Sequence, residues 1–109
     1  MNNNEASFNS KEFIMAAYAI GYLTLRNSEW VPEYSAHMPA LAQKHGGKPL
    51  AKAAPLVLEG SPLMPETQII VEFPSMEHAQ AWYDDPAHAP LKKLRQGGAD
   101  FSMVLLNGL

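Results

Sequence analysis

Residues 66–90, ETQIIVEFPSMEHAQAWYDDPAHAP, decide the fold of this 109-residue chain. Thr67–Phe73 is short, apolar and rich in β-branched residues, a composition that predicts a strand. Pro74 ends the strand because it has no N–H for the ladder, and Ser75 can then cap a helix. Asp85-Pro86 has the pattern of a second cap followed by proline at the first helical position. The stretch therefore predicts a strand, a turn and two consecutive helical pieces.

The elements before this stretch follow from the same kind of pattern. Residues 15–26 predict a strand that is apolar on both faces. A helix should follow from a cap at Asn27 or Ser28 and end at Gly46-Gly47. Pro39 lies in the interior of that helix, where proline should kink or divide it. The N-terminal half is therefore a strand followed by an interrupted helix.

A second strand and a last strand complete the order. Residues 48–53 and 55–59 predict one strand broken near Pro55, which cannot donate to a central ladder. A loop with two prolines, residues 60–65, then leads into the opening stretch. After the last helical piece, which we expect to end near Gln96, residues 101–106 predict the final strand. The order is β-α-β-β-α-β.

This order is typical of an α+β, ferredoxin-like fold, a four-stranded antiparallel sheet with its helices on one face. The first, third and fourth strands are nevertheless apolar on both faces. Helices on one side would leave a large apolar face in water. The simplest cover is the same face of a second copy, so we predict a two-fold homodimer formed through the sheet.

Composition excludes several functional classes. The net charge is −3 and only 17% of residues are charged. The single basic run, residues 92–95, suits a helix end, so we expect no nucleic-acid partner. No stretch approaches the roughly 18 apolar residues of a membrane span, so we expect no membrane partner. There is no cysteine, which excludes disulfides, thiol catalysis and cysteine-based metal sites.

The polar start of the chain lacks the apolar segment of a signal peptide. We interpret residues 1–14 as an N-terminal tail and residues 15–109 as the domain, in a cytoplasmic protein. Met15 is a second candidate start.

Several motifs together resemble the domain-of-unknown-function 1330 family, which belongs to the dimeric α/β-barrel superfamily. The resemblance covers about residues 15–109 and rests on these motifs: Glu33-Tyr34, Pro39-Ala40-Leu41, Gly46-Gly47, Leu58-Glu59-Gly60, Glu72-Phe73-Pro74-Ser75, Ala81-Trp82-Tyr83, Asp85-Pro86 and the ending VLLNGL. It implies a ferredoxin-like fold whose sheets pack across a dimer into a barrel. It implies no reaction, because related families include cofactor-free monooxygenases, isomerases, haem enzymes and ligand-sensing domains.

Three residues are candidates for catalysis: Glu72, His45 and Arg95. Glu72 is a carboxylate in an apolar strand, where burial would favour its protonated form and suit it to acid–base work. The alternative is a structural ion pair with Arg95 or a lysine. His45 ends the core-facing stripe of the first helix, where it is either a base in a pocket or a hydrogen-bonded structural residue.

Four residues are candidates for ligand binding: Tyr18, Glu59, Trp82 and Tyr83. Aromatic rings with polar tips are typical of small-molecule pockets, although Trp82 suits an ordinary core as well. Glu59 would share a site with Glu72. The histidines lack metal-site spacing and no phosphate-binding loop is present, so we predict neither a metal nor a cofactor.

These observations favour a homodimeric small-molecule protein whose site lies between the sheet and the helices. The leading hypothesis is a cofactor-independent enzyme. The alternatives are a non-catalytic binding or sensing module, and a structural dimer whose cleft is filled by its own side chains. An open cleft with converging polar groups would favour the first two.

Overall fold

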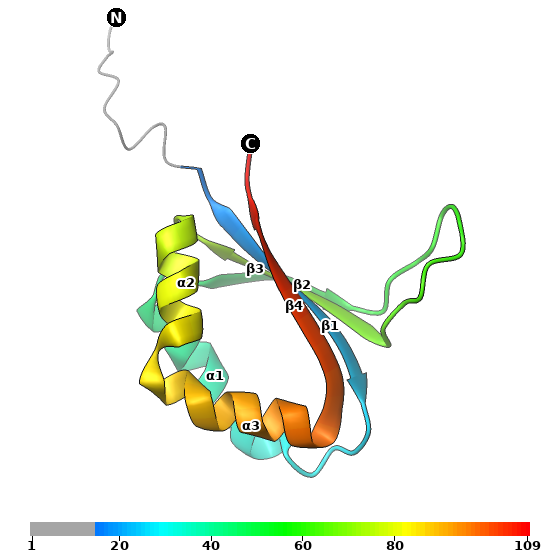
Figure 1. The fold of residues 1–109 in the computed structure, drawn as a ribbon, viewed down its shortest axis with the longest axis horizontal. Helices are drawn as coiled ribbons and strands as arrows, with labels where there is room; N and C mark the ends of the chain where they lie inside the picture. Colours follow the sequence, from blue (N-terminus) through cyan, green and yellow to red (C-terminus); the bar gives the residue numbers. More distant parts are fainter. Residues whose placement is uncertain (1–14) are drawn as a thin grey trace, which may run out of the picture.

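The computed structural model describes residues 15–109, which form one four-stranded sheet with its helices on a single face (Figure 1). The elements follow in this order: β1 (Ala17–Leu25), α1 (Val31–Lys44), β2 (Lys48–Ala53), β3 (Thr67–Phe73), α2 (Met76–Asp84), the 3₁₀ helix η2 (Pro86–His88), α3 (Ala89–Gly98) and β4 (Ala99–Asn107). The strand order is β2-β3-β1-β4 and every pair is antiparallel. The predicted α+β, ferredoxin-like fold is confirmed. The predicted tail, residues 1–14, lies outside the described residues.

Between β3 and α3, the helices begin at the caps that the sequence predicts. The Ser75 hydroxyl accepts a hydrogen bond from the His78 backbone N–H at 3.2 Å, which caps α2. The Asp85 carboxylate accepts one from the Ala87 N–H at 2.9 Å, which caps η2. Each side chain satisfies a backbone donor that a helix start leaves without a partner. Both predicted caps are confirmed.

Helix α1 differs from the prediction at its start, and Pro39 does not divide it. It begins at Val31 after a short turn in which Asn27 accepts a hydrogen bond from the Glu29 N–H, so neither predicted cap is used. The helix continues through Pro39 to Lys44 without being divided. The residues after the proline, Leu41 and Ala42, are buried in the core, and this packing stabilises the helix beyond its local preference.

The second strand is shorter than predicted. β2 ends at Ala53, and residues 55–59 belong to a loop that stands away from the body of the molecule (Figure 1). Beyond the Pro55 break this segment has no neighbouring strand to pair with, so the expected strand does not form. Its Leu56 and Leu58 are 84% and 90% exposed.

The hydrophobic core lies between the helices and one face of the sheet, which we call the inner face. Ala17 and Ala19 of β1 and Phe73 of β3 are buried there, with Leu41, Ala42, Ala79, Trp82 and Leu91 of the helices. Because side chains alternate along a strand, Tyr18 and Ile20 point to the opposite, outer face. No helix covers the outer face among the described residues (Figure 1).

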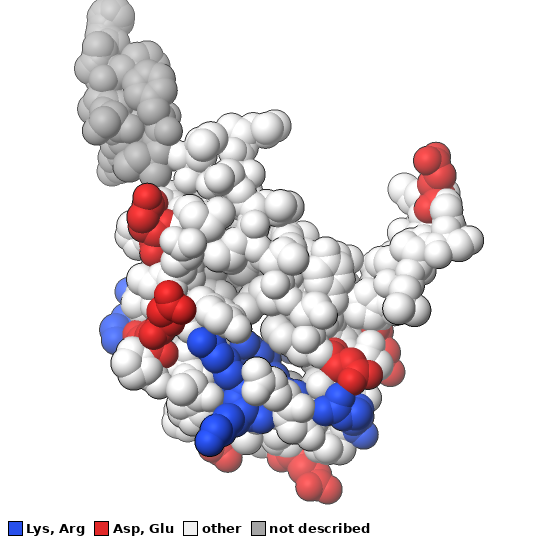
Figure 2. Space-filling view, viewed as in Figure 1, with Lys and Arg blue, Asp and Glu red and all other residues white. Residues whose placement is uncertain are grey.

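The outer face is apolar and open. Val104 and Leu106 of β4 are 46% and 55% exposed, and they pair with Ile20 and Tyr18 of β1. Figure 2 shows that Lys and Arg gather over α3, whereas the region around β4 beyond its first residues is nearly free of charged side chains. A face of this kind is typical of an interaction surface.

Candidate active site

A cavity of about 570 Å³ lies between the inner face of the sheet and the helices. Its walls are mostly apolar, with Ala19, Ile69, Val71, Phe101 and Met103 from the sheet and Met38, Pro39 and Ala42 from α1. The polar groups in the wall include Tyr34, Trp82 and Arg95. A mostly apolar cavity with a few converging polar groups is the usual form of a small-molecule site.

Arg95 is the buried charged residue in this wall. It is only 4% exposed, and its Nη1 atom donates to the Tyr34 hydroxyl at 3.0 Å and contacts His88 Nε2 at 2.8 Å. The guanidinium carbon lies 4.6 Å from the centre of the Phe101 ring. Each of these neighbours is uncharged or aromatic, so the side chain is fixed in place without a counterion from them.

His88 orients the Arg95 side chain through a hydrogen bond. The histidine is completely buried, and its Nδ1 atom lies 3.0 Å from the Trp82 carbonyl oxygen. A carbonyl only accepts and a guanidinium only donates, so Nδ1 carries the proton and Nε2 accepts from Arg95. Burial, together with the nearby positive charges of Arg95 and Lys92, lowers the pKa of His88 to about 4. The imidazole is therefore neutral at physiological pH.

Two residues of the cavity wall each have a buried donor without a partner. Arg95 Nε and Trp82 Nε1 are buried, and neither forms a hydrogen bond within residues 15–109. A buried donor without a partner costs free energy, about 1–3 kcal/mol and more when the group is charged. Both residues line the same cavity.

Tyr34 is the third polar group, and Trp30 holds it. Burial raises the pKa of the Tyr34 phenol, although the Arg95 cation acts in the opposite direction. Trp30 packs edge-on against the Tyr34 ring with 5.2 Å between the ring centres. The indole lies directly against Gly98, where any larger residue would overlap it. Tyr34 therefore remains protonated and well placed to donate or accept.

Two smaller cavities adjoin the main one. They have volumes of about 360 Å³ and 160 Å³, and both share Arg95 and Phe101 with the main cavity. Tyr83, a predicted ligand-binding residue, lines the first of them and carries the Lys92 ammonium 3.7 Å from its ring centre. The arginine therefore lies where all three hollows meet.

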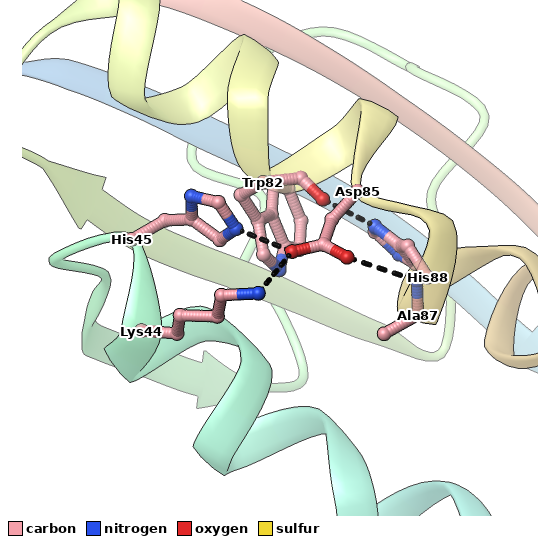
Figure 3. Close-up of polar contacts among 6 residues, drawn as sticks. All are labelled: Lys44, His45, Trp82, Asp85, Ala87 and His88. Carbon is pink, nitrogen blue, oxygen red and sulfur yellow. Dashed lines mark hydrogen bonds and ion pairs between the residues drawn. The ribbon is translucent and has the colours of Figure 1, made fainter.

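The second predicted catalytic residue, His45, lies elsewhere. Its Nε2 atom is 2.8 Å from an Asp85 carboxylate oxygen that also pairs with Lys44 at 3.0 Å (Figure 3). The hydrogen bond from His45, followed by those from the Ala87 N–H and Lys44, holds the pKa of Asp85 well below its usual range. His45 does not line the main cavity. This network joins the end of α1 to the junction between α2 and η2.

Glu72 lies on the outer face, so it does not share the cavity with Arg95, and the alternative ion pair with Arg95 or a lysine does not form among residues 15–109 either. The strand pairing places Glu72 opposite Tyr18, whose hydroxyl donates to Glu72 Oε2 at 3.1 Å. This hydrogen bond and the negative charge of Glu72 raise the pKa of Tyr18. Alternation places Glu72 and the buried Phe73 on opposite faces, and the helices cover the face of Phe73.

Glu59 does not join Glu72. It is exposed in the projecting loop between β2 and β3, which begins after Ala53. Of the seven predicted site residues, the main cavity brings together Arg95 and Trp82, and Tyr83 lines the adjoining one.

Sequence reasoning missed His88 and Tyr34. A usable signal was present for His88, because His88, Leu91 and Arg95 recur at the spacing of one helix face and are the buried side chains there. Tyr34 belongs to the recurrent stripe of α1 but gives no sign of its arginine partner. Within residues 15–109, no group of three or more acidic or histidine side chains could hold a metal ion. No helix in that range is long and apolar enough to cross a membrane.

Comparison with known protein families gives a match over nearly all of the described residues. The family described as "Domain of unknown function (DUF1330)" matches residues 16–109. The chain belongs to this family. The resemblance inferred from the motifs of residues 31–47, 72–75 and 81–86 is therefore confirmed. No curated protein matches the chain.

Solved structures of similar fold share little sequence with this family member. The RPA0582 protein of Rhodopseudomonas palustris, of unknown function, aligns with a TM-score of 0.71 at 18% identity, covering 99% of this chain and 95% of that chain. SnoaB from Streptomyces nogalater, a cofactor-independent oxygenase, gives 0.62 at 9% identity over 87% and 94%. A dimeric ferredoxin-like protein from Thermobifida fusca, of unknown function, gives 0.51 at 16% identity over 86% and 92%. At these identities the likeness shows the fold alone.

Proposed function

We propose that this member of the DUF1330 family is a homodimeric small-molecule-binding protein whose site is the 570 Å³ cavity between the sheet and the helices. The observation that carries the proposal is a mostly apolar cavity whose wall includes Arg95 and Trp82, two residues that each keep a buried donor without a partner. An open, mostly apolar cavity with a few polar residues in its wall supports binding over the alternative of a cleft filled by its own side chains.

The dimer is the second part of the proposal, and the outer face supports it. Tyr18, Ile20 and Val104 form an uncovered, largely apolar surface that the same surface of a second copy would bury. The structural neighbour from Thermobifida fusca is described as dimeric, which agrees with this arrangement.

Binding can be tested with the neutral fluorescent probe N-phenyl-1-naphthylamine. Ala42 lines the cavity, so Ala42→Phe should fill part of it and weaken probe binding at least tenfold. Ala36→Phe makes the same change at an exposed position of the same helix outside the cavity wall and should bind as the wild type does. Ser35→Trp, at an exposed cavity-lining position, provides a second blocking variant. Equal probe binding by all four proteins would exclude this cavity as the site.

Cofactor-independent catalysis is the second candidate function, and Arg95 is the observation that favours it. Of the three predicted catalytic residues, only Arg95 lines the main cavity. A fixed cation in an apolar site stabilises negative charge that develops on a substrate oxygen, as in enolate formation. Turnover of a substrate that is lost in Arg95→Met and kept in Glu72→Gln would establish this function.

A further inference from the structure

The charge balance around Arg95 points to the chemical class of the ligand. Arg95 is a buried cation, with only 4% of the residue exposed, and no carboxylate pairs with it among residues 15–109. A buried charge is costly unless a partner compensates it. The protein normally supplies such a partner as Asp or Glu, and here it supplies a neutral imidazole and a phenol.

The other charged residues in the cavity wall are also positive. Lys48 and Lys52 of β2 line the cavity with Arg95, and none of the described lining residues is acidic. More Lys and Arg side chains gather over α3 on the surface (Figure 2). A hollow lined by one sign of charge concentrates ligands of the opposite sign, even though the whole chain has a net charge of −3.

His88 is an uncharged hydrogen-bond partner of Arg95. Its Nε2 atom accepts from Arg95 Nη1 and is fixed as an acceptor by the Trp82 carbonyl, so the histidine fixes the arginine without neutralising it. A further donor of this cavity-lining residue, Nε, is buried without a partner. A carboxylate in place of His88 would have neutralised the cation and removed the need for an external anion.

We propose that the cavity binds small apolar anions, compounds with an aromatic or aliphatic body and one carboxylate, sulfonate or ionised enol oxygen. The anionic oxygen pairs with the Arg95 guanidinium, and the body packs against Met38, Val71 and Phe101. This inference rests on the proposed binding function and names the ligand class of the same site. It involves no covalent step.

A matched pair of fluorescent probes tests the charge preference separately from binding. N-phenyl-1-naphthylamine is neutral, and 8-anilino-1-naphthalenesulfonate has the same rings with an added sulfonate. We define the anion preference as the dissociation constant of the neutral probe divided by that of the anion. Because hydrogen bonds to charged groups contribute about 1.5–3 kcal/mol, Arg95→Met should lower this ratio about ten- to a hundredfold. Lys93→Met, at an exposed position of the same helix, should leave it within about twofold.

The outcomes separate the two claims. If Ala42→Phe weakens both probes but Arg95→Met leaves the anion preference unchanged, the cavity is a binding site and the anion assignment is wrong. If Ala42→Phe weakens neither probe, the proposed function itself fails. Should Arg95→Met not fold, displacement from the wild type decides the question. 2-Naphthoate should displace the bound anion at a concentration at least tenfold lower than 2-naphthamide, and equal displacement would overturn the inference.

Discussion

The Nη1 atom of Arg95 lies 2.8 Å from Nε2 of His88, a contact that only a neutral histidine can make. The pair lies seven residues apart on one face of η2 and α3, with the buried Leu91 between them. It gives the cavity a fixed, buried positive charge that the described protein leaves without a counterion. Stability, ligand class and pH dependence all follow from this arrangement.

The neutrality of His88 predicts a loss of stability in mild acid. Its pKa is about 4 in the folded protein, against an ordinary histidine pKa of 6.5, so the unfolded chain binds the proton more readily between these values. Its stabilising effect is complete above about pH 6.5 and is lost as the pH falls toward 4. The free energy of unfolding should fall by up to about 1.4 kcal/mol per pH unit in this window.

Urea unfolding at pH 7, 6 and 5, at one protein concentration, measures this dependence. His88→Gln should remove the corresponding part of the pH slope, whereas His37→Gln, at an exposed position of α1, should keep it. The groups facing His88 are Arg95, Lys92 and Asp85, and only Asp85 titrates in acid, below its usual value of 3.8. An unchanged slope in His88→Gln would show that His88 is not the titrating group.

Asp85 should stabilise the junction of the helices more than its neighbour Asp84. Asp85 accepts hydrogen bonds from His45, Lys44 and the Ala87 N–H, so Asp85→Asn weakens three contacts at once (Figure 3). Asp84→Asn removes an equal charge at an exposed position. Thermal unfolding should therefore show a clear drop in Tm for Asp85→Asn and little change for Asp84→Asn. Equal shifts would mean that the network contributes nothing beyond its charge.

Substitution by alanine should lower stability at Gly98 and raise it at Gly97. A Cβ at Gly98 would overlap the Trp30 ring, which donates to the Asn27 carbonyl and packs on Tyr34, so Gly98→Ala should cost about 1–3 kcal/mol. A Cβ at Gly97 meets nothing within 4 Å. Gly97→Ala should therefore stabilise α3, by about 0.5–1 kcal/mol. Chemical denaturation of both variants checks the pair, and a harmless Gly98→Ala would contradict the packing of Trp30.

The proposed dimer predicts a mass of about 24 kDa in light scattering at micromolar concentration, twice the 12.0 kDa chain mass. Val104→Glu places a charge on the outer face and should shift the protein to monomer. Ala36→Glu places the same charge at an exposed position of α1 and should leave the mass unchanged. A wild-type mass near 12 kDa would overturn the dimer.

Local chemistry allowed most of the fold to be predicted from the sequence. Pro74, Ser75 and Asp85-Pro86 determine where β3 ends and where the helices begin, and these are local choices. Pro39 and residues 55–59 were harder, because burial of Leu41 and Ala42 keeps α1 intact and the absence of a neighbouring strand leaves 55–59 as a loop. Both outcomes depend on contacts distant in the sequence.

The arrangement of the site depends even more on contacts between residues distant in the sequence. Glu72 looked chemically unusual, yet only the strand pairing shows that it faces Tyr18 on the outer side of the sheet. The partners of Arg95 come from α1, η2 and β4, three segments whose approach no local pattern reveals. The unusual features of the cavity are its unpaired donors and its missing carboxylate, and these exist only once the chain is folded.

A crystal structure of the protein with 2-naphthoate tests the central claim most directly. The account predicts the naphthalene rings in the cavity between α1 and the sheet, with a carboxylate oxygen about 3 Å from a guanidinium nitrogen of Arg95 and His88 still in contact with the guanidinium. An empty cavity under saturating 2-naphthoate, or a carboxylate that faces away from Arg95, would contradict it.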